Sequence, residues 1–213
     1  MSNIDDLGFA YRFEAPEIRS TRTTLLLLHD VGSDENQLLV FGRQVWKEAA
    51  LLAPRSDDLN SGVVSKTSQD ATGVEQLLTR TEKLSQFIEK ASLRYDFQFK
   101  QLVAIGYLGG ATVAASLILL HPHHVGAAIL LHPRLPFTPA IIRNFSELSI
   151  LISAGHRDDL IRQEIERLVT IFEAGGAEVS TFWRHDGHEL NSSDVDAAKA
   201  WLSEEHIRKH LAA

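Results

Sequence analysis

The sequence Gly106-Tyr107-Leu108-Gly109-Gly110 joins two apolar segments. Residues 102–105 form a short run typical of a buried strand, and the apolar residues 111–120 have the length of a helix. The glycines leave room for a tight turn from strand to helix. Such a turn would lift the side chain of Leu108 above the end of a sheet, with a strained or positive φ. Taken alone, the segment also fits an ordinary glycine-rich connection, which is the simpler interpretation.

Strand and helix patterns alternate along the rest of the chain. Strands are expected at residues 23–29, 49–53, 103–106, 127–131, 149–154 and 178–183, with residues 9–13 as an edge strand. Apolar residues recur at the helical period in segments 74–91, 161–172 and 195–202, with Ser192 or Ser193 as the expected N-cap of the last. The alternation favours an α/β fold with a mostly parallel sheet and helices on both faces. Residues 54–73 form the one long irregular stretch, and such a loop usually overlies a site or is mobile.

The composition is that of one globular domain, expected to span residues 1–213. A net charge of −7 argues against nucleic acid or an anionic membrane surface as a partner. The sequence has no cysteine, which excludes disulfides, thiolate metal sites and a cysteine nucleophile. It shows neither a long apolar run nor a basic leader followed by one, so we expect no membrane span, no signal peptide and a cytoplasmic protein.

Three further segments favour a more specific interpretation of residues 106–110. Residues 25–36 read LLLLHDVGSDEN and resemble the loop L-L-H-G-x-G-G-D-E-N of the α/β-hydrolases. Residues 152–158 (ISAGHRD) and 186–190 (DGHEL) resemble the segments that carry the acid and the histidine, and residues 106–110 resemble the nucleophile turn G-x-S-x-G. In this order the four segments resemble the small carboxylesterase, phospholipase and acyl-protein thioesterase branch. The resemblance implies the α/β-hydrolase fold without a separate lid domain.

The same resemblance implies catalytic roles for His188 and Asp158. His188 stands in the loop after the last expected strand, at the position of the catalytic histidine. The carboxylate of Asp158 would hold the His188 imidazole in one tautomer and stabilise its cation. Asp159 competes for this role, because the family pattern Asp-Pro-Ile-Val-Pro is replaced here by DDLIR, which lacks both prolines.

The nucleophile position is occupied by Leu108, which has no group that can attack a carbonyl. The resemblance assigns the two oxyanion-hole N–H groups to the backbone of Gly109 and Val31, and side-chain changes leave such donors in place. Asp30 stands where the family has a glycine. Its carboxylate either lies near this anion site and opposes oxyanion stabilisation, or turns to solvent or caps the following turn.

No other nucleophile is evident from the sequence. The remaining candidate hydroxyl groups do not occupy the turn, and a structural role is expected for each; they belong to Ser33, Thr112, Ser116 and Ser153. Residues 60–67 keep a trace of the family's Asn-Gly but none of the aromatic residues that line its acyl or aryl pocket. The nucleophile and the pocket have therefore changed together.

Two features could bind ions, and both have simpler interpretations. The histidine-rich segments 121–124 and 185–188 could offer nitrogen ligands. The first resembles a helix end followed by a loop and the second is explained by the hydrolase histidine, so neither a metal nor a cofactor is expected. Residues 132–136 resemble one rim of the family's cleft, where Arg134 could meet an anionic ligand, although a plain surface position explains Arg134 as well.

Three functions remain open. The first is a hydrolase relative with weak or absent esterase activity and a retained cleft for a small ester-like ligand. The second is an active enzyme in which His188 and Asp158 form a general-base pair without a covalent step. The third is a carboxylesterase with an unrecognised nucleophile. A homodimer is expected only by analogy with related small esterases.

Overall fold

The computed structural model describes residues 3–4, 7–8, 10–16, 22–30, 32–55, 71–155, 159–184 and 189–212. The strands are β1 (Asn3–Ile4), β2 (Ala10–Glu14), β3 (Thr24–Leu28), β4 (Ala50–Arg55), β5 (Leu102–Tyr107), β6 (Ala127–Leu131), β7 (Ser149–Gly155) and β8 (Glu178–Arg184). The α-helices are α1 (Leu39–Val45), α2 (Ala71–Tyr95), α3 (Gly109–Leu120), α4 (Asp159–Ala174), α5 (Ser192–Leu202) and α6 (Glu205–Ala212). Short 3-10 helices precede β5 (Phe99–Gln101) and β6 (Pro122–His124).

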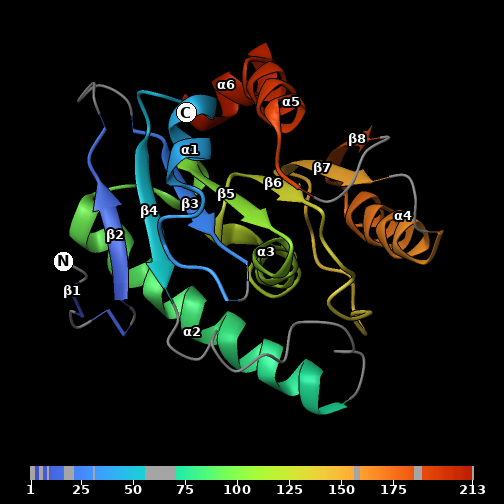
Figure 1. Cartoon of the computed structure of the whole chain (residues 1–213). Coiled ribbons are helices and arrows are strands. Elements are labelled where there is room, and N and C mark those ends of the chain that lie inside the picture. The colour runs from blue at the N-terminus through green and yellow to red at the C-terminus, as the bar shows by residue number, and fades with distance from the viewer. Residues whose placement is uncertain are drawn as a thin grey trace.

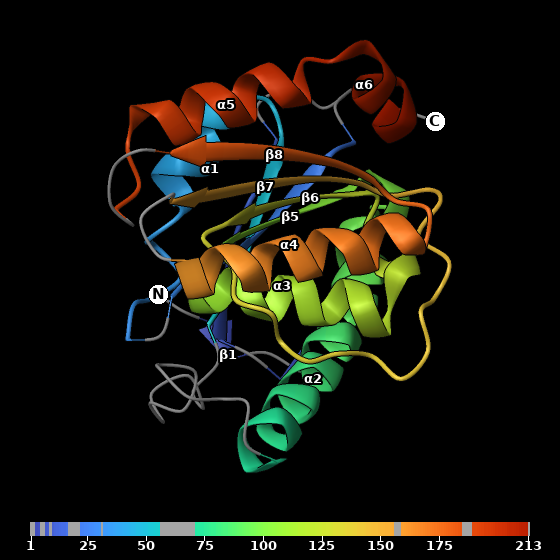
Figure 2. The same cartoon turned by 90° about the vertical axis from the view of Figure 1, so that its right-hand side faces the viewer.

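The strands form one sheet in the order β1-β2-β4-β3-β5-β6-β7-β8. The pairs β1–β2 and β2–β4 are antiparallel, and every other neighbouring pair is parallel. Helices α1, α5 and α6 cover one face of the sheet and α2, α3 and α4 cover the other (Figures 1 and 2). This arrangement confirms the predicted α/β-hydrolase fold class. The described helices lack the length and apolar character that a membrane span requires.

Strand β3 shows why a fully apolar run predicted a buried central strand. Its alternate side chains enter different cores: Leu25 and Leu27 pack with α1, α5 and α6, whereas Leu26 and Leu28 pack with α2 and α3. All four leucines are buried. A strand with helices on both faces has no polar side, which removes the alternation seen in half-exposed strands.

The start of α3 lies directly against the end of β3. A Cβ atom on Gly110 would come within 1.9 Å of the Leu28 carbonyl oxygen, and one on Gly106 would come within 2.5 Å of the Ala111 Cα. Only glycine permits both approaches, because any other side chain would collide with backbone that cannot move aside. The turn between β5 and α3 is therefore held beside the residues that follow β3.

Several predicted boundaries differ from the structure. The strand predicted as an edge strand at residues 9–13 corresponds to β2, which is the second strand of the sheet because β1 pairs with its outer side. The two ends of the predicted irregular stretch 54–73 are regular, because β4 continues to residue 55 and α2 begins at residue 71, while residues 56–70 lie outside the described residues. The N-cap of α5 is Asn191 rather than Ser192 or Ser193, since its side chain accepts the Ser193 N–H in a capping box completed by Asp194. Helices α1 and α6 were not predicted.

Candidate active site

Leu108 occupies a strained turn between β5 and α3. Its backbone has φ 49° and ψ −112°, in the left-handed region that a leucine rarely adopts, and this confirms the predicted positive φ. Two hydrogen bonds hold the turn: the Leu108 N–H donates to the Leu131 carbonyl at 2.9 Å, and the Leu108 carbonyl accepts the Thr112 N–H at 3.0 Å. The side chain is partly buried and packs against the core beneath α1 and α5. Strain of about 1–3 kcal/mol persists only where the surrounding structure enforces it.

Asp30 reaches this turn from the loop after β3. The Gly109 backbone N–H donates to Asp30 Oδ1 at 3.0 Å. The backbone of Asp30 is fixed as well, because its N–H donates to Gln37 Oε1 at 2.9 Å and its carbonyl accepts from His29 Nδ1 at 2.8 Å. The sequence left two positions open for the Asp30 carboxylate. In the structure it lies at the predicted anion site. It binds the donor assigned to the oxyanion hole.

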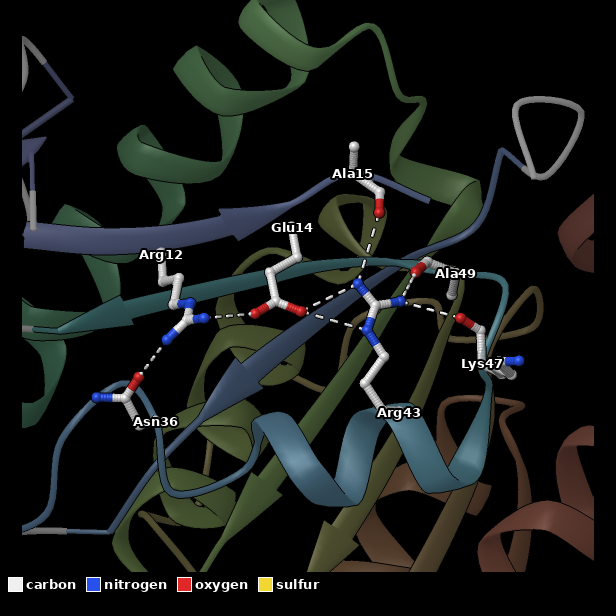
Figure 3. A network of polar contacts seen from close by, with 7 residues as sticks. All are labelled: Arg12, Glu14, Ala15, Asn36, Arg43, Lys47 and Ala49. Carbon is white, nitrogen blue, oxygen red and sulfur yellow. Dashed lines mark hydrogen bonds and ion pairs between the residues drawn. The ribbon is translucent and has the colours of Figure 1, made fainter. Parts of the chain in front are cut away.

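Polar contacts link the segment after Asp30 to the neighbouring elements (Figure 3). Arg12 of β2 donates to Asn36 Oδ1 at 2.9 Å and pairs with Glu14 Oε1 at 2.9 Å. Arg43 of α1 donates to Glu14 Oε2 through Nε and Nη2, and its Nη1 donates to the Ala49 carbonyl at 2.8 Å. Asn36, which follows Asp30 in the sequence, and Arg43 of α1 are therefore both tied to β2.

The other predicted site residues fall largely where the structure gives no description. His188, Asp158 and Val31 lie outside the described residues, as do residues 60–67. Asp159, the alternative acid, begins α4, and its exposed carboxylate accepts a hydrogen bond from Arg162 Nη2 at 3.1 Å. Asp159 thus already has a partner on its own helix.

Three of the four candidate hydroxyls have structural partners. Thr112 Oγ1 donates to the Leu108 carbonyl and accepts the Arg134 N–H at 3.1 Å. Ser116 is fully buried and accepts a hydrogen bond from Thr81 Oγ1, and Ser153 donates to Asp194. These contacts confirm the structural roles predicted for Thr112, Ser116 and Ser153.

Two groups considered for ion binding are also engaged. Arg134 forms a two-point pair with the Glu164 carboxylate, at 2.6 and 2.8 Å, so its guanidinium already has an anionic partner within the protein. His121 and His124 lie within 3.1 Å of Glu82 and Glu89 respectively, next to α2. Among the described residues, no three His, Asp or Glu side chains are grouped as metal ligands.

The sequence did not predict a buried ion pair at the ends of β7 and β8. Arg184, the last residue of β8, pairs with Asp194 in the first turn of α5, and the two are 4% and 1% exposed. Ser153 Oγ donates to Asp194 Oδ1 at 2.9 Å. His132 Nε2 lies 3.3 Å from Arg184 Nη1. The buried side chains of Arg184, Asp194 and Ser153 are thus hydrogen-bonded, as is usual for buried polar groups.

This ion pair also contacts the described residues that follow the segment bearing His188. Arg184 precedes residues 185–188, and its Nη1 donates at 2.9 Å to the carbonyl of Glu189, which follows them. Asp194 Oδ2 accepts the Asn191 N–H at 3.1 Å. Residues on either side of segment 185–188 are thus attached to one buried pair, and the segment itself lies outside the described residues. The sequence gives no sign that Arg184 is buried, because a charged residue at the end of a strand usually lies at the surface. The Asn191-x-x-Asp194 capping pattern is the one local signal, and it indicates only the position of Asp194.

The phenol of Tyr107, next to Leu108, has a pKa raised above its ordinary value. Burial is the main cause and the Asp30 carboxylate is the next, while a backbone hydrogen bond from Leu190 acts in the opposite direction. In the unfolded chain a tyrosine ionises near pH 10, so the stability linked to neutral Tyr107 is present below that pH and is lost as the pH rises further.

Asp30→Asn is expected to lower the pKa of Tyr107, because the substitution removes a nearby negative charge and leaves burial unchanged. The phenolate absorbance measures this, since the chain has only two other tyrosines, Tyr11 and Tyr95. Asp34→Asn is the matched control, because it removes the same charge from the same loop. An unchanged titration curve in Asp30→Asn would place Asp30 away from Tyr107 in solution.

Comparison with known proteins agrees with this fold. Residues 44–200 match the model of the dienelactone hydrolase family. The chain is 33% identical over 184 residues to MhqD of Bacillus subtilis (strain 168), which covers 84% of this chain and 92% of the relative. The structure is similar to a carboxylesterase of Bacillus cereus, with 30% identity, a TM-score of 0.83 and coverage of 95% and 94% of the two chains. A carboxylesterase of Mesorhizobium loti matches with 28% identity and a TM-score of 0.81 over 94% of this chain and 97% of that one. The chain belongs to the dienelactone hydrolase family within the α/β-hydrolase superfamily.

Proposed function

We propose that this protein is a hydrolase relative that has lost covalent serine catalysis and retains a cleft for a small ester-like ligand. The observation that carries the proposal is Leu108 in the strained turn between β5 and α3. In this fold the residue at that turn is the nucleophile. An aliphatic side chain there cannot form an acyl-enzyme, and its bulk fills space that a substrate carbonyl needs.

The contact between Gly109 and Asp30 supports the same proposal. Ester hydrolysis passes through a tetrahedral oxyanion, and preorganised N–H groups stabilise it. Here a carboxylate oxygen accepts the Gly109 N–H, so the donor is occupied by a group that carries negative charge when ionised. Both departures act against ester hydrolysis, one on the attacking group and the other on the developing charge.

His188 and Asp158 are still present in the sequence, so two other functions are tested against the proposal by an esterase assay. Wild-type protein is expected to hydrolyse p-nitrophenyl butyrate at the background rate, and His188→Ala is expected to leave that rate unchanged. Turnover that His188→Ala abolishes would instead favour a general-base enzyme. Turnover that survives in His188→Ala would indicate a different nucleophile. Leu108→Ala serves as a control, because it empties the turn without adding a reactive group.

We also propose an assembly and a location for the protein. A homodimer follows from analogy with small esterases, and a cytoplasmic location follows from the sequence pattern and the absence of cysteine. Light scattering of the purified chain at micromolar concentration separates monomer from dimer.

A further inference from the structure

A small pocket lies at the edge of the sheet where β5, β6 and β7 begin. It has a volume of about 200 Å³, and Lys100, Gly126 and Leu148 in its lining stand just before these three strands. Neighbouring parallel strands begin at the same edge of a sheet, and α6 adds His210 from this side (Figure 2). Leu108 follows the other end of β5, so the pocket is separate from the candidate active site.

Most of the polar side chains that line this pocket can donate hydrogen bonds. Lysine offers three N–H donors and no acceptor, and the side chains of histidine, asparagine and serine each offer at least one donor. The polar residues in the described lining are Lys100, His123, Asn144, Ser146, Glu147 and His210. Glu147 is the one acid among them, although the whole chain carries a net charge of −7. The pocket is thus richer in donors and in basic residues than the chain as a whole.

Several of these donors are not used within the protein. The Nε2 atom of His210 is buried and has no hydrogen-bond partner. Such atoms are uncommon in native proteins, and a bound water or ion is one explanation for them. Asn144 Oδ1 accepts the Ser146 N–H at 3.0 Å, which leaves the Asn144 Nδ2 group to donate elsewhere. The Lys100 ammonium forms no ion pair with any residue that the structure describes.

The backbone around the pocket is held in place by direct contacts. A Cβ atom on Gly126 would come within 1.9 Å of the Lys100 carbonyl oxygen, so the segments before β5 and β6 touch. The Phe145 N–H donates to the Gly175 carbonyl at 2.7 Å, and the Leu148 N–H donates to the Phe145 carbonyl at 2.9 Å. These bonds fix the loop before β7. A backbone that is already ordered reduces the entropy lost when a ligand binds.

We propose that this pocket binds the phosphate group of a small molecule, at a second site away from the turn at Leu108. A phosphate group presents several strong acceptor oxygens, which match a lining in which donors predominate. The Lys100 ammonium supplies a charge-assisted hydrogen bond, the stronger kind of hydrogen bond. A carboxylate ligand has fewer acceptor oxygens and a smaller charge. Lys100 and Glu147 are exposed, so water screens their charges and millimolar affinity is expected.

Titration with inorganic phosphate and with acetate, at an ionic strength held constant with chloride, tests the inference. The ¹⁵N–¹H NMR signals of Gly126 and Ser146 report binding, and phosphate is expected to shift them saturably and at lower concentration than acetate. Lys100→Met is expected to weaken phosphate binding by about fivefold, the upper size of an exposed charge interaction. His210→Phe keeps a ring but removes its nitrogens, and a loss of about fivefold is expected. Glu147→Gln is expected to strengthen binding by about twofold, because it removes the one acid.

Lys199→Met is the matched control, because it removes the same charge from an exposed position on α5 outside the pocket. It is expected to bind phosphate as wild type does. Equal binding by wild type and Lys100→Met overturns the inference, as does acetate binding as tightly as phosphate or the absence of a saturable shift. Methyl phosphate identifies the source of the group: binding at least as tight as that of inorganic phosphate assigns a phosphate monoester, and weaker binding assigns free phosphate.

Discussion

Asp30→Gly in a Leu108→Ser background is expected to raise the rate of p-nitrophenyl butyrate hydrolysis by about 10²–10³-fold over Leu108→Ser alone. The serine supplies the missing nucleophile, but the oxyanion it creates would form next to the Asp30 carboxylate. Removing that carboxylate frees the Gly109 N–H, and one oxyanion-hole donor contributes about 10²–10³ in rate. The measurement is kcat for the two variants at one pH.

Two further variants separate the effect of the Asp30 charge on the rate from the effect of freeing the Gly109 N–H. Asp30→Asn in the same background removes the charge but keeps an oxygen on the Gly109 N–H, so an intermediate rate is expected. Asp34→Gly in that background is the control and is expected to match Leu108→Ser. If Leu108→Ser with Asp30→Gly is no faster than Leu108→Ser, the carboxylate does not obstruct the oxyanion hole.

Arg184→Met is expected to lower the free energy of unfolding by about 3–5 kcal/mol. The substitution leaves the Asp194 carboxylate buried and without its cation, and an uncompensated buried charge has a cost of about this size. Denaturation in urea, monitored by circular dichroism, measures the change. Arg162→Met is the matched control, since Arg162 forms an exposed pair with Asp159 and is expected to lose at most about 1 kcal/mol.

The double variant Arg184→Met with Asp194→Leu is expected to recover part of the loss. Replacing a buried ion pair with apolar side chains is often neutral, but here Ser153 and Asn191 would each lose an acceptor. Recovery is therefore incomplete. Equal destabilisation by Arg184→Met and Arg162→Met would show that the buried pair contributes little to stability.

Local sequence rules were sufficient for the strands β2 to β8 and for the turn at Leu108, but they missed the edge strand β1. The apolar runs predicted the central strands because burial on both faces leaves no other pattern. The glycines around Leu108 predicted the tight turn, since Gly106 and Gly110 meet backbone where a Cβ would stand. The N-cap of α5 was missed because three adjacent polar residues compete for it, and the choice of Asn191 depends on its partner Asp194.

The contacts that define the candidate site depend on packing between distant segments, and the sequence alone could not decide them. The sequence left Asp30 with two orientations, because nothing local distinguishes a turn-capping carboxylate from one that reaches residue 109. Arg184 and Asp194 are ten residues apart and meet because β8 pairs with β7 in the sheet and α5 packs on β7. Such pairs become visible only when the sheet register brings their elements together.

Intact-mass measurement after incubation with a fluorophosphonate probe tests the central claim most directly. The probe adds covalently to an activated nucleophilic serine. Wild-type protein is expected to keep its unmodified mass, because Leu108 stands at the turn where that serine belongs. Leu108→Ser with Asp30→Gly is expected to gain the mass of one probe molecule, which shows that the reagent can reach the site. A one-probe gain in wild-type protein would contradict the loss of covalent catalysis.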